Sequence, residues 1–326
     1  MKRHAPSVWV VLVVFACVIG LFWSHRRAGS AVGDDDIERR KATIISEGVR
    51  MRGDVYSLKS LAGQRLPAII MAHGWGGTAA MLLPQAVTFA RAGYVVVALD
   101  YRGWGDSDSR VILVSPAPTE KTGLRFTAEV MEVREVVDPL DQVTDIFNTI
   151  HWAMGEPMVD PTRIGLWGTS YSGGHVLHVA AYDSRVKAVV SQVGFMDSRA
   201  AYTRSEQALS RANTEATQRT RGELGYPPPG AREVGDLRGG PIREKFLRYV
   251  PVDDMPRIKG CALLFIGAER EELFDNRNHA ELAYQRASEP KKYVVVPGIA
   301  HYGIYGEARE HATKLAIDWF DQYLKK

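Results

Sequence analysis

The stretch Ile164-Gly-Leu-Trp-Gly-Thr-Ser-Tyr-Ser-Gly-Gly174 places Ser170 between an apolar run and a segment with helical spacing. The run Arg163 to Trp167 predicts a buried strand, and the segment Gly173 to Ala181 predicts a helix. A serine at a sharp strand-to-helix turn projects its hydroxyl, and nearby backbone N–H groups point toward the developing oxyanion. The stretch therefore predicts Ser170 as a nucleophile.

A second serine, Ser172, competes for this role. In the usual nucleophile motif, Gly-x-Ser-x-Gly, the last glycine stands at this position. The position demands a small residue because helix and strand approach closely there. If the strand ends at Trp167 or Gly168, Ser170 lies at the apex of the turn and Ser172 lies in the first helical turn, where serine is a common capping residue. The register favours Ser170.

Outward from this turn, short apolar or β-branched runs alternate with longer amphipathic stretches, which is the pattern of a largely parallel sheet with helices between its strands. An antiparallel hairpin over residues 42–57 is expected at the edge of this sheet. The predicted strands are Ala68 to Met71, Tyr94 to Leu99, Arg163 to Trp167, Val186 to Gln192, Ala262 to Ile266 and Lys292 to Val296. The predicted helices are Ala79 to Ala92, Asp141 to Met154, Gly173 to Ala181, Asn276 to Ala287 and Glu307 to Tyr323.

The interval at about 196–259 breaks this alternation. It is polar, rich in Arg, Glu and Ala, and interrupted by Pro227-Pro228-Pro229-Gly230. An interval of that length inside a compact domain usually carries function or its own structure. We predict a helical cap inserted over the carboxyl edge of the sheet; the alternative is a flexible excursion without a role in the pocket.

The glycine-rich stretch Ala72-His73-Gly74-Trp75-Gly76-Gly77 follows the first predicted parallel strand. Its glycines let the backbone curl so that an N–H points into the site. The expected oxyanion donors are the backbone N–H groups of Tyr171 and Trp75, with Gly76 as the second choice for the latter. His73 is interpreted as a structural histidine that fixes this loop.

Three segments together resemble the α/β-hydrolase superfamily: His73 to Gly77, Asp100 to Ser107 and Gly168 to Gly173. Within the superfamily, the dienelactone-hydrolase-like and Xaa-Pro-dipeptidyl-peptidase-like serine hydrolases are the most similar. The resemblance spans roughly residues 45–325. It implies an α/β-hydrolase fold, a mostly parallel sheet with helices on both faces, and structural rather than catalytic roles for Arg102 and Asp106.

The resemblance also implies a triad in the chain order serine, acid, histidine, with the base in a loop after the last strand. His301 lies in such a loop, after Lys292 to Val296 and before the final predicted helix, so we predict it as the general base. The other histidines flank the apolar N-terminal run or fall inside predicted helices: His4, His25, His151, His175, His178, His279 and His311.

The acid should follow the strand Ala262 to Ile266, where the chain offers four carboxylates. Members of the superfamily usually carry Asp there, whereas this chain has Arg270 and Glu271 at the matching places. A glutamate can orient the imidazole and stabilise its cation with one more methylene to place. We predict Glu271 as the acid; the alternatives are Glu272, Glu269 and Asp275, of which Asp275 also fits as a helix N-cap.

Composition narrows the function class. The chain has 326 residues, 45% hydrophobic and 24% charged, with 41 basic and 38 acidic residues and no long basic block, so a nucleic-acid partner is not expected. Its two cysteines, Cys17 and Cys261, are poorly placed to pair, and we expect no disulfide, metal or cofactor.

The run Val8 to Trp23 carries no charge and has basic residues on both sides. We predict residues 1–27 as an uncleaved membrane anchor, or else a cleavable signal peptide, followed by a linker over 28–41 and the hydrolase domain over 42–326. A single-pass anchor with an extracytoplasmic catalytic domain is expected, or a secreted or periplasmic protein if the segment is cleaved.

The predicted reaction is nucleophilic acyl transfer on a small-molecule carboxylic ester or thioester, with Ser170 as nucleophile. Trp75, Tyr171 and Tyr302 stand beside the catalytic residues in sequence and are expected to line the substrate pocket, unless they only pack around a rigid loop. A peptidase, an acyltransferase or a non-catalytic, membrane-attached binding protein on the same fold are the alternatives, because fold and triad do not determine the acceptor.

Overall fold

The computed structural model describes residues 34–199 and 205–325. The predicted anchor or signal segment over 1–27 and the first part of the linker lie outside the described residues. None of the helices within 34–199 and 205–325 combines the length and the apolar character needed to cross a bilayer. The first long strand begins at Ile37, inside the segment predicted as linker.

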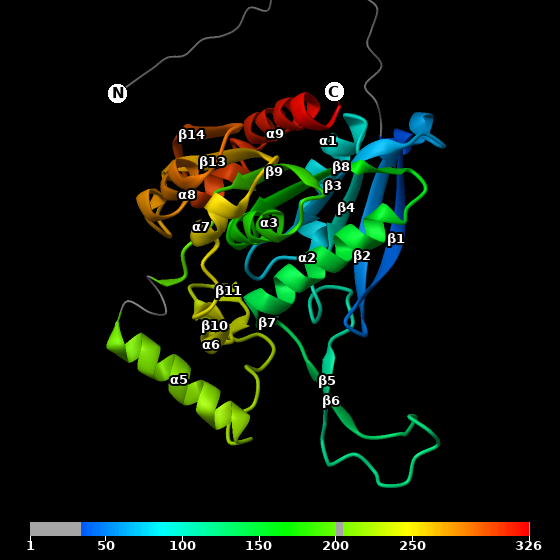
Figure 1. Ribbon diagram of the computed structural model, residues 1–326, viewed down its shortest axis with the longest axis vertical. Helices are drawn as coiled ribbons and strands as arrows, with labels where there is room; N and C mark the ends of the chain where they lie inside the picture. Colours follow the sequence, from blue (N-terminus) through cyan, green and yellow to red (C-terminus); the bar gives the residue numbers. More distant parts are fainter. Residues whose placement is uncertain (1–33, 200–204, 326) are drawn as a thin grey trace, which may run out of the picture. The chain divides into compact units, whose positions relative to one another are not determined.

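An eight-stranded sheet in the order β1-β2-β4-β3-β8-β9-β13-β14 forms the centre of the molecule (Figure 1). β1 and β2 form an antiparallel hairpin, β2 pairs antiparallel with β4, and the strands from β4 to β14 run parallel. The bounds are β1 Ile37–Ser46, β2 Val49–Leu58, β3 Leu66–Ala72, β4 Val95–Leu99, β8 Val159–Thr169, β9 Val186–Gln192, β13 Ala262–Arg270 and β14 Lys291–Ala300.

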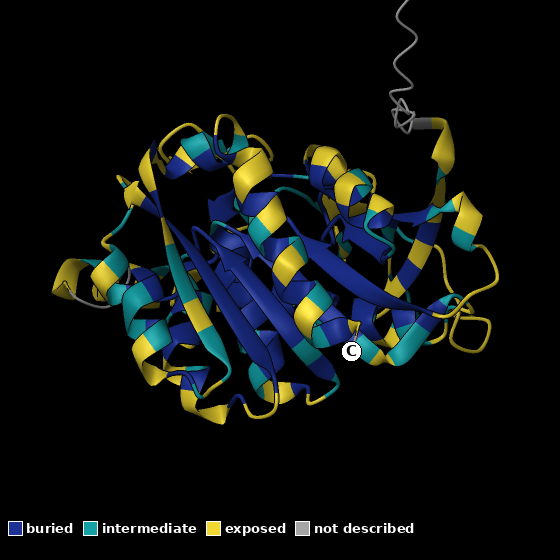
Figure 2. Ribbon diagram, turned by 90° about the horizontal axis from the view of Figure 1, so that it is seen from above, coloured by how far each residue is buried: buried dark blue, intermediate teal, exposed yellow. Residues whose placement is uncertain are grey.

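Helices cover both faces of this sheet, as Figures 1 and 2 show. α1 (Leu83–Arg91) and α9 (Arg309–Leu324) pack in one apolar core. The other core contains α2 (Pro139–Met154), α3 (Tyr171–Tyr182) and α8 (Ala280–Arg286). Because both faces are covered, the central strands β3 and β4 are buried along their whole length, and Figure 2 shows the buried strands beneath exposed helix surfaces.

The prediction of a mostly parallel α/β sheet is confirmed, since all six predicted strands form and pair as parallel neighbours. Two predicted helices differ. The segment Ala79 to Ala92 begins with the 3-10 turn η3 (Ala79–Leu82) before α1. The segment Asn276 to Ala287 is split into the 3-10 turn η5 (Asn276–Asn278) and α8, because His279 adopts a non-helical conformation. Its ring Nδ1 accepts hydrogen bonds from the backbone N–H groups of Met196 and Asp197, which ties this break to the chain after β9.

The interval predicted as a helical cap has mixed structure. Its described part contains one long helix, α5 (Glu206–Thr220), two short helices, α6 (Arg243–Phe246) and α7 (Pro251–Asp254), the turn η4 (Met255–Arg257) and the short strands β10 (Arg232–Val234), β11 (Leu237–Arg238) and β12 (Gly240–Pro241). β12 pairs with β7 (Val136–Val137), so this interval contacts a second excursion of the chain, which lies between β4 and α2.

That second excursion was not predicted from the sequence. β5 (Arg110–Leu113) and β6 (Val130–Val133) form a separate antiparallel pair that extends away from the main sheet in Figure 1. Each strand has only four residues, and neither alternates polar and apolar residues, so no strand pattern appears in the sequence.

Candidate active site

The predicted turn forms at Ser170, between the end of β8 at Thr169 and the start of α3 at Tyr171. Ser170 has a φ of 55°, a conformation that L-residues rarely adopt outside constrained turns. Its backbone N–H donates to the carbonyl of Gln192 on β9 at 2.8 Å, and its carbonyl accepts from the N–H of Phe195 at 3.0 Å. The neighbouring strand therefore stabilises the strained turn.

Ser172, the competing serine, is fully buried. Its hydroxyl donates to the carbonyl of Ala72 at 2.7 Å and accepts from the backbone N–H of Thr169 at 2.8 Å. The side chain thus joins the turn to the end of β3 and does not face the cavity at Ser170. Its role in the fold explains a serine at the position where the usual motif has glycine.

His301 lies directly after β14, in the 3-10 turn η6 (His301–Tyr305), and is buried. Its Nε2 is 3.0 Å from Oγ of Ser170, so the serine hydroxyl can donate to the imidazole. Phe274 packs against the edge of the ring at a centroid distance of 5.7 Å. The structure thus brings together two residues that are 131 positions apart in the sequence.

The four candidate carboxylates, one at the end of β13 and three after it, have four different partners. The two oxygens of Glu271 are 2.9 and 2.8 Å from Nδ1 of His301, and both side chains are almost completely buried. Glu272 accepts instead from the backbone N–H of His301 at 2.7 Å, and Glu269 from that of Gly298 at 2.7 Å. Asp275 caps the turn η5 through the N–H of Arg277.

The loop after β3 approaches the serine closely. A Cβ on Gly74 would lie 3.0 Å from Cβ of Ser170 and 3.0 Å from the carbonyl oxygen of Thr169, so the loop requires glycine there. His73 is buried, its Nδ1–H donates to the carbonyl of Gly74 at 3.0 Å, and its ring packs on Tyr101. Burial lowers the pKa of His73 to about 4, so the ring is neutral at pH 7.

The two expected oxyanion donors lie on the two segments that meet at Ser170, α3 and the turn after β3. Tyr171 is the first residue of α3, and Trp75 lies in the turn after β3. Their rings pack at a centroid distance of 5.1 Å, and Phe246 of α6 packs against both. The indole N–H of Trp75 also donates to the carbonyl of Gly239 at 3.2 Å, so the inserted interval supports this loop.

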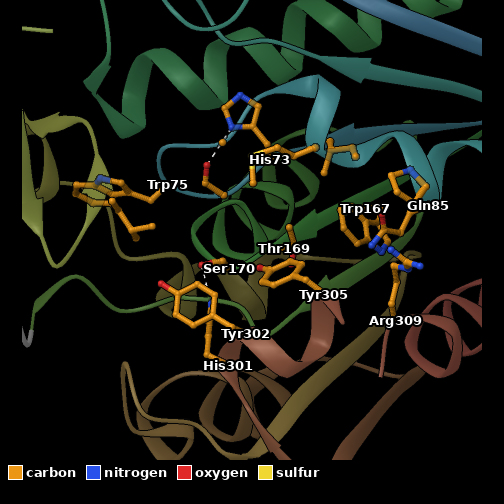
Figure 3. A pocket seen from close by; sticks show the side chains of 16 residues that line it. His73, Trp75, Gln85, Trp167, Thr169, Ser170, His301, Tyr302, Tyr305 and Arg309 are labelled. Carbon is orange, nitrogen blue, oxygen red and sulfur yellow. Dashed lines mark hydrogen bonds between the residues drawn. The ribbon is translucent and has the colours of Figure 1, made fainter. Parts of the chain in front are cut away.

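A cavity of about 370 Å³ opens at Ser170 and His301 (Figure 3). Trp75 and Tyr302 line it, as expected from the sequence. Tyr171 does not, because its ring is buried against Phe246 and His175 instead of facing the cavity. The remaining lining residues come from the loop after β3, α1, β8, β11, η6 and α9: His73, Gly74, Gly77, Met81, Leu82, Pro84, Gln85, Trp167, Thr169, Leu237, Tyr305 and Arg309.

Tyr305 was not predicted as a site residue. Its hydroxyl is 2.8 Å from Oγ1 of Thr169, which also accepts from Nε2 of Gln192 at 3.2 Å. Burial raises the pKa of Tyr305, and the hydrogen bond with Thr169 partly opposes that shift. The position four residues after His301, within one short turn of the base, is the only sequence signal that links this tyrosine to the site.

Comparison with known proteins agrees with this fold. Residues 47–237 match the model of the X-Pro dipeptidyl-peptidase (S15) family. An uncharacterized 31.7 kDa protein of Escherichia coli is 29% identical over 285 residues, which cover 79% of this chain and 91% of that protein. A thiohydrolase of Aspergillus aculeatus is 29% identical over 149 residues, 45% of this chain and 39% of the relative.

Among solved structures, the α/β hydrolase GrgF of a Penicillium species superimposes with a TM-score of 0.69 at 21% identity, over 89% of this chain and 99% of that one. The family match over residues 47–237, together with this fold, defines the class: the chain is a member of the α/β-hydrolase superfamily, with a serine-hydrolase type of activity. Within that class, the chain belongs to the X-Pro dipeptidyl-peptidase (S15) family.

Proposed function

We propose that the protein cleaves carboxylic esters or thioesters through an acyl-enzyme on Ser170. One observation carries the proposal: a continuous hydrogen-bonded path runs from Oγ of Ser170 to Nε2 of His301, and from Nδ1 of His301 to the carboxylate of Glu271. Nucleophile, base and orienting acid in this arrangement are the requirements of serine acyl transfer.

The proposed mechanism follows from these contacts. His301 takes the hydroxyl proton as Ser170 attacks the carbonyl carbon, and the carboxylate of Glu271 holds the ring and stabilises its cation. The backbone N–H groups of Trp75 and Tyr171 hold the oxyanion. His301 then returns the proton to the leaving alkoxide or thiolate. Water attacks the acyl-enzyme with His301 again as base, which releases the acid and restores Ser170.

A fluorophosphonate probe tests the nucleophile. We expect the wild-type protein and the Ser172→Ala variant to become labelled, and Ser170→Ala to remain unlabelled. Failure of the folded wild-type protein to react would favour a non-catalytic binding protein on a hydrolase fold. Labelling of Ser170→Ala but not of Ser172→Ala would move the nucleophile to Ser172.

Peptide cleavage and acyl transfer to another acceptor are the second candidates. The name of the S15 family supports a prolyl peptidase, and the Aspergillus relative, named as a thiohydrolase, supports thioesters. Product analysis with matched aryl esters, thioesters and Xaa-Pro anilides separates these reactions. We expect the esters and thioesters to have the higher kcat/KM; faster release from the Xaa-Pro anilides would make the protein a peptidase.

We also propose, from the sequence alone, that the uncharged run over residues 8–23 anchors the protein to a membrane with the catalytic domain outside the cytoplasm. Fractionation of cells that express the full chain and a chain beginning at residue 34 tests this. The full chain should sediment with membranes and resist carbonate extraction, whereas release of both chains in soluble form would contradict an anchor.

A further inference from the structure

The cavity at Ser170 continues to a second, polar end. Figure 3 shows Gln85, Trp167 and Arg309 grouped together at the end away from Trp75. Gln85 comes from α1, Trp167 from β8 and Arg309 from the first residue of α9. β8 is a strand of the sheet, and α1 and α9 pack with Trp167 in one apolar core.

Two buried polar atoms at this end have no hydrogen-bond partner within residues 34–199 and 205–325: Oε1 of Gln85 and Nε1 of Trp167. Gln85 is 6% exposed and Trp167 is 1% exposed. A buried polar atom without a partner destabilises the fold, so native proteins rarely keep one. Two of them grouped at one end of the cavity indicate a position that a polar ligand group fills.

Arg309 adds a positive charge at the same place. In the part of the chain that the structure describes, no hydrogen bond or ion pair occupies its guanidinium group, although it lines the cavity. Arg309 is exposed, unlike Arg102, which is buried and paired with Asp145. A guanidinium group matches a carboxylate with two parallel hydrogen bonds.

The donors and acceptors on these three side chains determine which ligand group fits. The indole N–H of Trp167 and the N–H groups of Arg309 can only donate, so the group must accept. The amide of Gln85 has a soft terminal torsion, so it can turn its NH₂ group toward the same acceptor. Tyr305 lies between this end and Ser170 in Figure 3, and the cavity wall also contains the apolar residues Leu82 and Pro84.

We infer that Gln85, Trp167 and Arg309 form a subsite for a carboxylate that the substrate carries at a distance from its scissile bond, separated from it by an apolar spacer. This inference rests on the proposed function, since it gives the substrate class of the same site. The carboxylate can belong to the acyl part or to the alcohol part of the ester, and the two sources are distinguishable by experiment.

The test compares isosteric esters with and without the charge, on the full chain. For the acyl side, the mono-4-nitrophenyl esters of succinate to suberate are compared with neutral 4-nitrophenyl acylates of equal length. For the alcohol side, 6-acetoxyhexanoate is compared with heptyl acetate. We expect kcat/KM to favour the carboxylate at least about tenfold in one of the two series, at one or two chain lengths.

Variants locate the preference. In Arg309→Met and Trp167→Phe, the ratio of kcat/KM for charged over neutral ester should fall about tenfold or more, whereas Arg125→Met, on the distant β5–β6 excursion, should keep the wild-type ratio. A wild-type ratio near one at every length, or a ratio that Arg309→Met leaves unchanged, would overturn the subsite. The proposed function would still stand if the neutral esters are hydrolysed.

If the wild-type protein hydrolyses neither ester, the proposed function fails and binding decides the subsite separately. Calorimetry on the Ser170→Ala protein with the monomethyl esters of succinate to suberate should then detect binding at one or more chain lengths, weakened at least about tenfold by a second change, Arg309→Met. Absence of binding at every length, or equal binding to both proteins, would overturn the subsite.

Discussion

Both carboxylate oxygens of Glu271 lie within 2.9 Å of Nδ1 of His301, and the two side chains are buried together. The strand β13 continues to Arg270, whose register with β14 shifts so that Arg270 pairs with Ala300, the residue before the histidine. Glu271 therefore leaves the strand opposite the imidazole. The longer side chain of glutamate reaches the ring from this position.

Loss of this carboxylate should reduce turnover severely without unfolding the protein. We expect Glu271→Gln to lower kcat by about 10³–10⁴, because an amide can present its NH₂ group to Nδ1, favour the wrong tautomer and leave the imidazolium without a counter-charge. Ester hydrolysis measures the effect, with fluorophosphonate labelling rates as a second readout.

Asp275→Asn is the matched control, because that carboxylate is exposed and bonds to Arg277. It should retain kcat within about threefold. An equal loss in both variants would show that the whole segment after β13, and not the contact with His301, matters. Glu271→Asp should recover part of the activity if charge at Nδ1 is the requirement.

Ser172→Ala should affect stability more than chemistry. Its buried hydroxyl bonds to Ala72 and Thr169, and its loss leaves a buried N–H and a carbonyl less well satisfied, so we expect a decrease in the free energy of unfolding of about 1–3 kcal/mol. Urea unfolding measures this decrease. A stable variant that no longer reacts with fluorophosphonate would contradict the assignment of Ser170.

Much of the fold and part of the site could be predicted from the sequence, for definite physical reasons. The central parallel strands are buried on both faces, so they appear as continuous apolar runs. Ser170 follows such a strand, whereas His301 follows the partly exposed edge strand β14, and the loops that carry them have distinct composition. The choice among four carboxylates could not be made as firmly, because Glu271 and Glu272 are adjacent and only the shifted register of β13 places one at the ring and the other at the backbone.

Other contacts between distant segments could not be predicted. The β5–β6 excursion has runs too short to form a pattern, and Trp167 appears in the sequence only as one apolar residue of a strand. Its unpartnered indole N–H becomes visible only when α1 and α9 are placed beside it. The side chain of Tyr171, expected in the pocket, packs under the loop because α6 brings Phe246 against it.

Gly74→Ala should reduce activity through crowding at the nucleophile. The new methyl group would lie 3.0 Å from Cβ and 3.5 Å from Oγ of Ser170, so either the loop or the serine must move. Since displacements of about 1 Å can cost about 10²-fold in rate, we expect a loss of that order in kcat. Gly225→Ala, which meets no atom within 4 Å, is the control and should match the wild-type enzyme.

Tyr305→Phe tests the residue that the sequence did not indicate. Removal of its hydroxyl deprives Thr169 of a partner at 2.8 Å beside the nucleophile, so we expect kcat to fall about three- to tenfold while KM changes less. Tyr182→Phe, which also loses a hydrogen bond but lies on the exposed end of α3, should leave both constants unchanged. Equal kinetics for Tyr305→Phe and the wild-type enzyme would give Tyr305 a packing role only.

The buried His73 should make stability depend on pH. Its pKa is lowered from 6.5 to about 4 by burial, so the unfolded chain binds a proton before the folded chain does. This contribution to stability is complete above about pH 6.5 and decreases as the pH falls toward 4, by roughly 2 kcal/mol between pH 7.5 and 5. His175, also buried with a lowered pKa, adds a loss in the same direction.

Urea unfolding of the wild-type protein and of His73→Gln at pH 7.5, 6 and 5 isolates the contribution of His73. The variant lacks the titrating ring, so its free energy of unfolding should fall less steeply with acid, and the difference between the two proteins should narrow by about 2 kcal/mol from pH 7.5 to 5. His311→Gln, at an exposed position on α9, should follow the wild-type slope. A constant difference between wild type and His73→Gln would mean that His73 becomes protonated in the folded protein as readily as in the unfolded chain.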